Sequence, residues 1–208
     1  MIAEVLFLLL AAIISARSPI GQPPAADAVV LFDGKSFQGW EGNLKIFRIE
    51  DGAIVGGSLT EKIVRNEFLC TTTSYGDFEL RLKVKLVGGD AANAGIQFRT
   101  SRIPDNHEVA GYQADMGTGW WGALYDESRR KKVLVQAPPN TPIRHSDWND
   151  YVITAQGPKI TLELNGVKTV EYTEQEAGIA QDGFIALQVH SGPAIQVEFR
   201  NLKIRELR

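Results

Sequence analysis

The stretch from Asn93 to Glu127 holds the side chains of this sequence that are best suited to chemistry. Alternate side chains of a β-strand share a face. Gln97 and Arg99 are therefore predicted to share one face of a strand, and Gln113 and Asp115 to share a face of the next strand. Amide, guanidinium and carboxylate groups beside exposed aromatic rings bind the hydroxyls and ring faces of sugars. The pattern favours a sugar-binding surface.

Gln188 and His190 form a third alternating pair, much later in the chain. If the three strands are neighbours, their polar rows merge into one concave patch. The alternative is that these are ordinary solvated side chains, which the outer face of every β-sandwich carries. The grouping of a histidine, an aspartate, an arginine and several amides near aromatic residues favours the patch.

Trp120, Trp121 and Tyr125 are the aromatic residues next to this patch in the sequence. Adjacent residues on a strand face opposite ways, so at most one of the two tryptophans is expected to face a ligand. The other is expected in the core or in a turn, and so are Trp40 and Trp148.

Short strands separated by turn signals make up the chain from residue 29 onward. Apolar and polar residues alternate strictly over Phe78–Lys85, and Asn165-Gly166 is typical of a two-residue hairpin turn. No segment has sustained helical periodicity, although 174–180 could form one helical turn. Further strands are expected at 151–154, 159–164, 167–170, 184–190 and 195–199. We predict an all-β fold, a two-sheet antiparallel jelly-roll sandwich.

Composition limits the class of protein. The chain has 208 residues and a net charge of −3, which suits a single globular domain and gives no reason to expect a nucleic-acid partner. The basic run 129–132 is short and is interpreted as a solvated turn or strand end. The single Cys70 cannot form an internal disulfide, and without a visible base or an electropositive site it is interpreted as structural.

The first residues resemble a secretory signal. Residues 1–16 contain an apolar run that is too short for a comfortable membrane span, followed by small residues. Glu4 disagrees with this interpretation, because a signal usually begins with basic residues. Cleavage is expected at the end of this segment or near Ala26, and an uncleaved membrane anchor is the alternative. We therefore expect an exported protein, periplasmic or extracellular, with a flexible leader at 17–28 and a single domain at 29–208.

Several motifs, in order along the chain, resemble those of the 3-keto-disaccharide hydrolase domain family. The segment 111–115 (GYQAD), followed by 121–127 (WGALYDE), matches the most specific block of the family. NAGIQFR at 93–99 is similar to its N-S-G-I-x-F-R motif, with Ala94 in place of serine. The other matching segments are LFDGK at 31–35, FRIEDG at 47–52, YGDFEL at 75–80, WN at 148–149, LNG at 164–166, IALQVHSG at 185–192 and FRNLKIREL at 199–207.

The resemblance spans roughly residues 29–208 and implies a concanavalin A-like jelly roll of the lectin and glucanase type. It also implies an exported bacterial protein that acts on glycosides oxidised at C3 of the sugar. A non-catalytic carbohydrate-binding or interaction domain on the same scaffold is the main alternative, and a classical glycosidase is a third.

Direct displacement at C1 of the sugar is disfavoured by the sequence. Related jelly-roll glucanases carry paired carboxylates on one strand, and a retaining glycosidase needs its two carboxyl groups about 5 Å apart. Here Gln113 stands where the nucleophile would be, and no second acid follows Asp115 on the strand. A 3-keto sugar offers elimination instead, because the ketone acidifies the C2 proton. A base removes this proton, the enolate expels the C1 substituent, and water adds to the unsaturated product.

Four residues are predicted to be catalytic. His190 or Asp115 would be the base, Glu127 the acid for the leaving group or a metal ligand, and Arg99 the group that stabilises the enolate oxygen. Each has a structural alternative: Arg99 and Asp115 as an inter-strand ion pair, His190 as the cap of a strand, and Glu127 as an ordinary loop charge.

A metal ion is a further hypothesis. Asp115, Glu127, His107 and His190 could assemble a site for a divalent ion, although no spacing resembles a dedicated ligand motif. His107 is expected in a loop at the rim, and His145 is interpreted as structural. The residues predicted to bind the carbohydrate are Asn93, Gln97, Gln113, Trp120, Trp121, Tyr125 and Gln188.

Overall fold

The computed structural model describes residues 27–207, which form strands, turns and loops. The predicted signal segment 1–16 and nearly all of the predicted leader 17–28 lie outside the described residues. In the part of the chain that the structure describes, no helix is long and apolar enough to cross a membrane.

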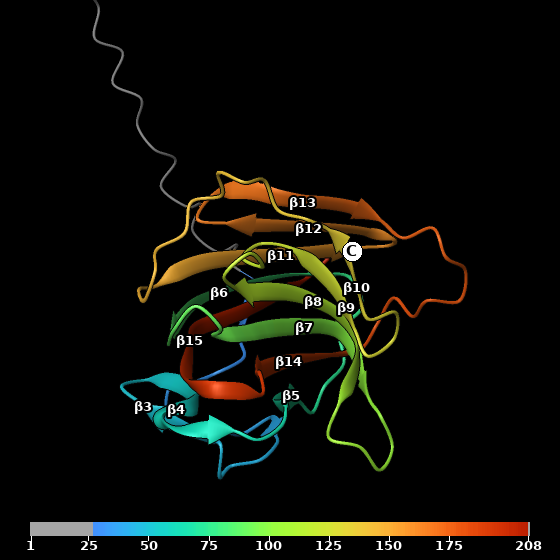
Figure 1. Ribbon diagram of the computed structural model, residues 1–208. Helices are drawn as coiled ribbons and strands as arrows, with labels where there is room; N and C mark the ends of the chain where they lie inside the picture. Colours follow the sequence, from blue (N-terminus) through green and yellow to red (C-terminus); the bar gives the residue numbers. More distant parts are fainter. Residues whose placement is uncertain (1–26, 208) are drawn as a thin grey trace, which may run out of the picture.

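Two antiparallel sheets form the sandwich that the sequence predicts, and β7 and β8 are seen in front in Figure 1. Sheet A runs in the order β13 (Val167–Thr173), β12 (Lys159–Leu164), β11 (Asn149–Gln156), β6 (Phe78–Val87), β15 (Gly192–Glu206), β4 (Ala53–Ile63) and β3 (Phe47–Glu50), with β1 (Val29–Val30) paired to β15. Sheet B runs in the order β10 (Lys132–Val135), β9 (Leu124–Glu127), β8 (Val109–Gly117), β7 (Asn93–Arg102), β14 (Phe184–Val189), β5 (Glu67–Thr71) and β2 (Trp40–Glu41).

The core lies between the two sheets and follows the sequence alternation. Phe78 and Leu80 of β6 and Phe98 of β7 are fully buried, and Phe78 meets Phe98 edge to face. Asn165 and Gly166 both have positive φ angles, 51° and 80°, as a type I′ hairpin turn requires. Residues 174–180 contain a turn but no helix.

A β-bulge interrupts the pairing of β7 with β8. The register shifts between Phe98 and Ser101, and Arg99 has a φ of 45°. Across the ladder from the bulge lies Gly111, where an added Cβ would be 2.6 Å from Thr100 Cα. Only a glycine allows the two strands to approach this closely. The bulge changes the alternation of side chains along β7.

Arg99 points away from Gln97 as a result, and the prediction that they share a face is wrong. The side chain of Arg99 is 1% exposed. Its guanidinium donates to Gly76 O at 3.1 Å, Gly157 O at 2.6 Å and Asp77 Oδ1 at 2.8 Å. It therefore ties β7 to the segment before β6 and to the β11–β12 turn. Neither the enolate role nor the ion pair with Asp115 fits this placement.

We expect Arg99→Ala to lower the free energy of unfolding by about 3 kcal/mol, because it removes a buried charged partner and leaves two carbonyls unpaired. Urea denaturation measures the change. Arg102→Ala is the matched control on the same strand, since the Arg102–Glu41 ion pair is exposed and should contribute less than about 1 kcal/mol. Equal stability of the two variants, together with lost activity in Arg99→Ala, would return Arg99 to the candidate site.

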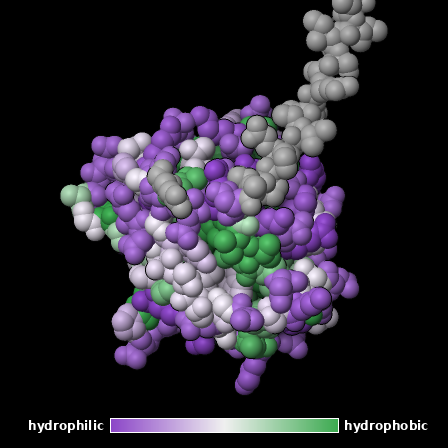
Figure 2. Space-filling view, turned by 180° about the vertical axis from the view of Figure 1, so that it is seen from behind, coloured by the Kyte–Doolittle hydropathy of each residue, from purple (hydrophilic) through white to green (hydrophobic). Residues whose placement is uncertain are grey.

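The far side of the molecule is mainly hydrophilic, with one apolar area near its centre (Figure 2). Isolated exposed apolar side chains are ordinary in folded domains, whereas buried polar side chains are rare and informative. In residues 27–207 several buried polar side chains gather on sheet B.

Candidate functional site

The outer face of sheet B carries a group of buried polar side chains, here called the polar face. Gln97 of β7, Gln113 and Asp115 of β8 and Gln188 of β14 are each at most 3% exposed. The ladder register places Gln97 opposite Gln113, and Gly95 between Asp115 and Gln188. The structure thus brings together the polar rows of three strands, as predicted.

Gly95 makes room for the polar face. A Cβ at this position would lie 2.5 Å from Cδ of Gln113. The Gln113 side chain can therefore lie across β7 only because Gly95 has none. The family motif at 93–99 contains this glycine, and the close packing of the Gln113 side chain explains why a glycine is needed there.

A chain of amides converges on Asp115. Asn93 Nδ2 donates to Asp115 Oδ1 at 3.4 Å, and the Met116 amide donates to the same oxygen at 2.9 Å. Gln97 Nε2 donates to Gln113 Oε1, and the Gln113 side chain bonds to Asp115 in turn. The donors all point toward the carboxylate, so Gln97 Oε1 is left buried with no partner in the described chain.

Burial raises the pKa of Asp115 to about 7, although hydrogen bonds from Met116, Gln113 and Asn93 act in the opposite direction. The charge of Glu127 raises the pKa further. A carboxyl group with a pKa near 7 is present in both protonation states at neutral pH, which suits an acid or a base in catalysis.

Tyr151 holds the backbone at Asp115 from the opposite sheet. This β11 side chain is buried in the core, and its hydroxyl donates to Asp115 O at 2.6 Å. The same hydroxyl accepts from the Gly122 amide at 2.8 Å. The end of β8 and the β8–β9 turn are therefore fixed by one residue of sheet A.

Glu127 of β9 is the second carboxyl group of the site. Burial raises its pKa, and the charge of Glu108 raises it further, while hydrogen bonds from Gln188 and Ser128 and the proximity of His190 lower it. Gln188 Nε2 donates to Glu127 Oε2 at 3.2 Å, and the Ser128 amide donates to Oε1 at 3.2 Å. Residues from β9, from β14 and from the loop before β8 thus meet around one carboxyl group.

His190 follows the end of β14, and its environment fixes a tautomer. Nδ1 lies 2.6 Å from Ser191 O. A carbonyl oxygen only accepts, so Nδ1 carries the hydrogen and Nε2 of the neutral ring is a free base. The free Nε2 fits the predicted role of His190 as a base, and the contact of Nδ1 with Ser191 O fits the alternative that His190 caps the strand.

Glu108 and Asn66 belong to the rim of the site and were missed by the sequence interpretation. Asn66 Nδ2 donates to Glu108 Oε1 at 3.2 Å, and His107 Nε2 lies 3.5 Å from the same oxygen. His107 is thus at the rim, as predicted. Loop residues have no alternation pattern, so only the proximity of Glu108 to His107 in the sequence could have indicated it.

The two adjacent tryptophans have different environments, as expected. Trp120 is 39% exposed and its ring meets Tyr125 edge to face at 6.1 Å. Trp121 is in the core cluster, so its predicted contact with a ligand on the polar face is wrong. Trp40 is buried with its Nε1 bonded to Leu31 O, and Trp148 packs under Arg200. Both are structural, as predicted.

The residues proposed for a divalent ion do not form a ready-made site. Within residues 27–207, no three side chains of the His, Cys, Asp and Glu types converge closely enough to hold a metal ion. The set Asp115, Glu127, His107 and His190 therefore does not fit an ion bound by three of them, and no step below is assigned to one.

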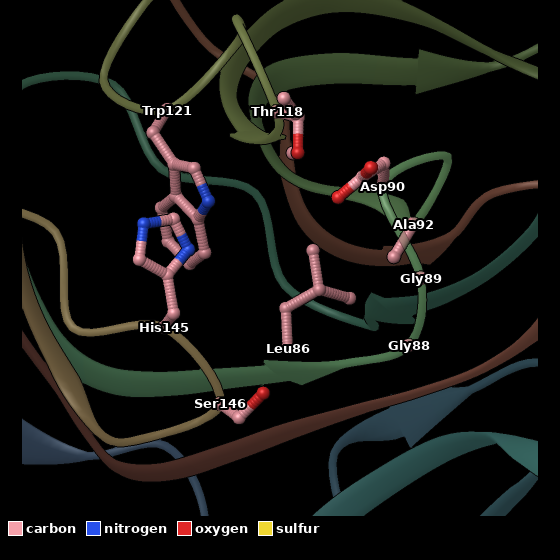
Figure 3. Close-up of a pocket in the computed structure, with 10 residues that line it drawn as sticks. Leu86, Gly88, Gly89, Asp90, Ala92, Thr118, Trp121, His145 and Ser146 are labelled. Atoms are coloured by element: carbon pink, nitrogen blue, oxygen red, sulfur yellow. The ribbon is translucent and has the colours of Figure 1, made fainter.

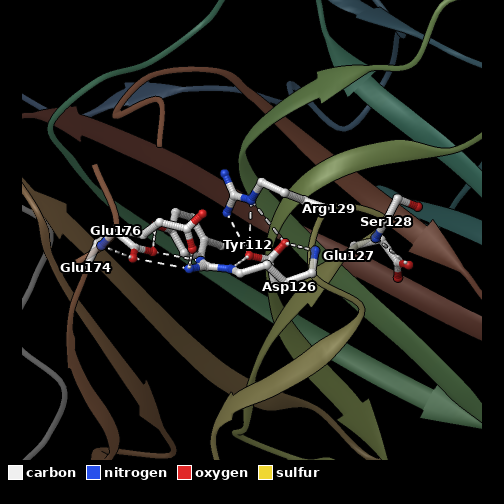
Figure 4. Close-up of polar contacts among 8 residues, drawn as sticks. Tyr112, Asp126, Glu127, Ser128, Arg129, Glu174 and Glu176 are labelled. Carbon is white, nitrogen blue, oxygen red and sulfur yellow. Dashed lines mark hydrogen bonds and ion pairs between the residues drawn. The ribbon is translucent and has the colours of Figure 1, made fainter. Parts of the chain in front are cut away.

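The β9–β10 turn that follows Glu127 is locked by ion pairs (Figure 4). Asp126 is fully buried and accepts from Arg129 and Arg130. Arg130 continues to Glu174 at 2.7 Å, and Tyr112 donates to Glu174 at 2.6 Å. The basic run is a turn, as predicted, but its two arginines are mostly buried rather than solvated. The network joins the strand that carries Glu127 to the β13–β14 loop.

A sandwich of this kind is a jelly roll, here with amides and carboxyl groups on the outer face of one sheet. A family model described as the 3-keto-alpha-glucoside-1,2-lyase-like domain matches residues 27–205. The chain belongs to this family, as its motifs suggest. No curated protein matches the sequence significantly.

Solved structures with the same fold include sugar-related proteins. A putative glycosyl hydrolase from Parabacteroides distasonis is 20% identical with a TM-score of 0.69, covering 88% of this chain and 94% of that one. The carbohydrate-binding module CBM66 from Bacillus subtilis is 15% identical with a TM-score of 0.61, covering 81% and 96%. A Bacillus subtilis protein with a galectin-like fold is 8% identical with a TM-score of 0.66, covering 86% and 94%. At these identities the likeness establishes the jelly-roll fold.

Asp115→Asn should make the protein more stable at alkaline pH. The folded-state pKa of Asp115 is raised to about 7 from 3.8, so its stabilising contribution is present below pH 3.8 and is lost as the pH rises through 7. A neutral asparagine avoids this loss, and we expect the melting temperature at pH 8 to rise by about 5 °C.

Thermal unfolding of both proteins at pH 4 and at pH 8 measures this effect. The advantage of the variant should grow from pH 4 to pH 8. Asp182→Asn, at an exposed position, is the control and should show no such trend. A constant difference between Asp115→Asn and the parent protein would show that folding does not raise the pKa of Asp115.

Glu174→Gln should weaken the ion-pair network and make the stability of the protein less sensitive to acid. Burial disfavours the charged form of Glu174, but Arg130 and Tyr112 more than offset this and hold its pKa at about 2. Its stabilisation is therefore present above pH 4.5 and lost as the pH falls toward 2. We expect the variant to lose about 2 kcal/mol at pH 7 and to unfold less steeply on acidification.

Chemical denaturation at pH 7 and pH 3 tests this expectation. Glu176→Gln is the matched control, because Glu176 pairs with the same Arg130 but is 60% exposed. Its effect should stay below about 0.5 kcal/mol. Equal effects of the two substitutions would mean that the network contributes nothing beyond a surface ion pair.

Proposed function

We propose that this protein cleaves glycosides whose sugar is oxidised at C3, by elimination of the C1 substituent followed by hydration. The observation that carries the proposal is the pairing of two carboxyl groups with raised pKa values, Asp115 and Glu127, near a histidine with a free Nε2. Elimination needs a base and an acid that are both available near neutral pH. The family description names a 3-keto-alpha-glucoside lyase activity, which supports this reaction class.

His190 Nε2 is assigned as the base in this proposal. It takes the C2 proton, and the C2–H electron pair forms a C2–C3 double bond while the C3 carbonyl oxygen gains the negative charge. The enolate then re-forms the ketone and expels the C1 substituent, giving a C1–C2 double bond. Water adds its oxygen to C1, and the proton returns to C2, so the overall reaction consumes one water.

Glu127 is assigned as the acid that protonates the leaving oxygen. Its raised pKa keeps a larger fraction of it protonated than an ordinary glutamate has. Asp115 and the amides of the polar face are assigned to bind the sugar hydroxyls and the enolate oxygen. Asn93 and Glu127 are only partly buried, so they are the members of the site that a sugar hydroxyl can reach directly.

Incubation with an aryl 3-keto-glucoside in D₂O tests the proposal. We expect aryl alcohol release and a product that carries deuterium at C2, because elimination exchanges this position. His190→Ala and Glu127→Gln should each reduce turnover by about 100-fold or more. Activity should fall as the pH rises through the pKa of Glu127, and Glu127→Gln should lack this decline. Release without deuterium at C2 would indicate direct displacement and overturn the mechanism.

A non-catalytic carbohydrate-binding domain is the second candidate. It is favoured by the exposed Trp120 beside Tyr125, which offers a stacking surface at the margin of the polar face. Binding of an unoxidised glycan, without turnover of any keto-glycoside, would support this candidate. Export to the periplasm or the cell exterior is part of either proposal and rests on residues 1–16. Mass measurement of the mature protein tests it.

A further inference from the structure

A cavity of about 280 Å³ opens at one end of the sandwich, and we call it the end pocket. Three chain segments enclose it: the β6–β7 turn, the β8–β9 turn and the loop before β11. Its lining residues are Leu86, Gly88, Gly89, Asp90, Ala92, Gly117, Thr118, Trp121, His145 and Ser146. None of these is a residue assigned to cleavage above.

The two sides of the end pocket differ in chemistry (Figure 3). The rings of Trp121 and His145 lie together on one side, while Thr118 and Asp90 lie on the other, with Leu86 between them. Trp121 is buried, so the exposed imidazole of His145 is the accessible ring face of this side, and hydroxyl and carboxylate groups lie opposite it.

The polar groups of the end pocket are not engaged with the protein. Within residues 27–207, the side chains of Asp90, Thr118, His145 and Ser146 form none of the hydrogen bonds or ion pairs found between side chains, and the Trp121 indole has no protein acceptor. Unused donors and acceptors that converge on one cavity are available to a ligand.

The walls of the end pocket are already in place. Trp121 N donates to Gly117 O at 3.1 Å, and Tyr151 fixes the following Gly122. The loop that carries His145 is held by the buried Asn149, which accepts from Arg144 N and donates to Arg144 O, both at 2.9 Å. A preformed pocket binds a small ligand without the cost of ordering loops.

The volume and charge of the end pocket limit the kinds of ligand that can bind there. It has one carboxylate and no lysine or arginine in its lining, so an anion is not expected. A single carboxylate with hydroxyls is also a poor set for a divalent ion, which takes several charged oxygens. A neutral polyhydroxylated ring with one apolar face fits both walls.

We infer that the end pocket is a second carbohydrate site, which binds one hexopyranose unit independently of the cleavage site. The exposed His145 provides the ring face against which the sugar packs, Trp121 supports it from the core side, and Asp90 accepts hydrogen bonds from adjacent hydroxyls of the sugar. Gly117 is two residues beyond Asp115 on β8, about 7 Å along the strand. The two sites are therefore neighbours that use different side chains.

Titration of ¹⁵N-labelled protein with methyl hexopyranosides (gluco, galacto and manno, both anomers) tests the inference. The Trp121 indole signal is assigned with Trp121→Phe. We expect a saturable shift of this signal for at least one sugar, with a Kd in the millimolar range. Asp90→Ala and His145→Ala should each weaken binding about 10-fold, and Asp182→Ala, a distant exposed acid, should have no effect.

The variant Asp115→Asn separates this inference from the proposed function. It should lose turnover of keto-glycosides but leave the Trp121 shift unchanged. Absence of any shift up to about 100 mM sugar would overturn the inference while leaving the cleavage proposal intact. A shift that Asp115→Asn abolishes and Asp90→Ala does not would place the sugar on the polar face, which also overturns it. Asp90, His145 and Asp182 are exposed, whereas Trp121 and Asp115 are buried, and the spectra report directly whether each variant is folded.

Discussion

The hydroxyl group of Tyr151 joins the two sheets at the place where the polar face begins. It is buried in an apolar core, and it both donates to Asp115 O and accepts from Gly122 N. Gly122 N also donates to Asp115 O at 3.2 Å, so the Tyr151 hydroxyl reinforces a direct hydrogen bond between the two groups, and its loss would cost about 1 kcal/mol. The end of β8 and the β8–β9 turn therefore have one arrangement. Asp115 lies near the end of β8, and Trp121 lies within the turn that follows.

Burying the side chains of the polar face costs free energy. Asp115, Gln97 and Gln188 are almost inaccessible to water, and two of their acceptor oxygens have no partner in the described chain. The sandwich around them must supply the stability that they forgo, through its apolar core and through the Arg99 and Arg130 ion pairs. This division of roles is common, because the groups that perform chemistry are seldom those that stabilise the fold. Both arginines connect sheet B with loops of sheet A, so they stabilise the sandwich around the polar face.

The fold could be predicted from the sequence because each strand carries its own alternation. Phe78–Lys85 and the Asn165-Gly166 turn are local signals, and the structure confirms them. The placement of Gln97, Gln113, Asp115 and Gln188 on one face also followed from alternation. Arg99 was misplaced because a bulge adds one residue without any visible change in the pattern. Alternation could not decide which of Trp120 and Trp121 is buried, because both lie in a turn, where alternation does not apply.

Other parts of the site depend on contacts between distant segments. Glu108 acts on the charge of Glu127 because it immediately precedes β8, which pairs with the strand that carries Glu127, and no local pattern encodes this pairing. The pKa of Asp115 depends on complete burial, which is a property of the packed sandwich. The roles of His190 and Glu127 are likewise not determined by the geometry alone and stay predictions.

The order of the strands has a consequence for how this chain reaches its folded state. β14 lies between β7 and β5 in sheet B, and β15 lies between β6 and β4 in sheet A. These two late strands therefore occupy interior positions, one in each sheet, and neither sheet is complete until they have emerged from the ribosome. Such non-local pairing makes folding slow, and it leaves a nascent chain without a complete core. Until β14 and β15 have emerged, the earlier strands lack their neighbours and stay open to chaperones.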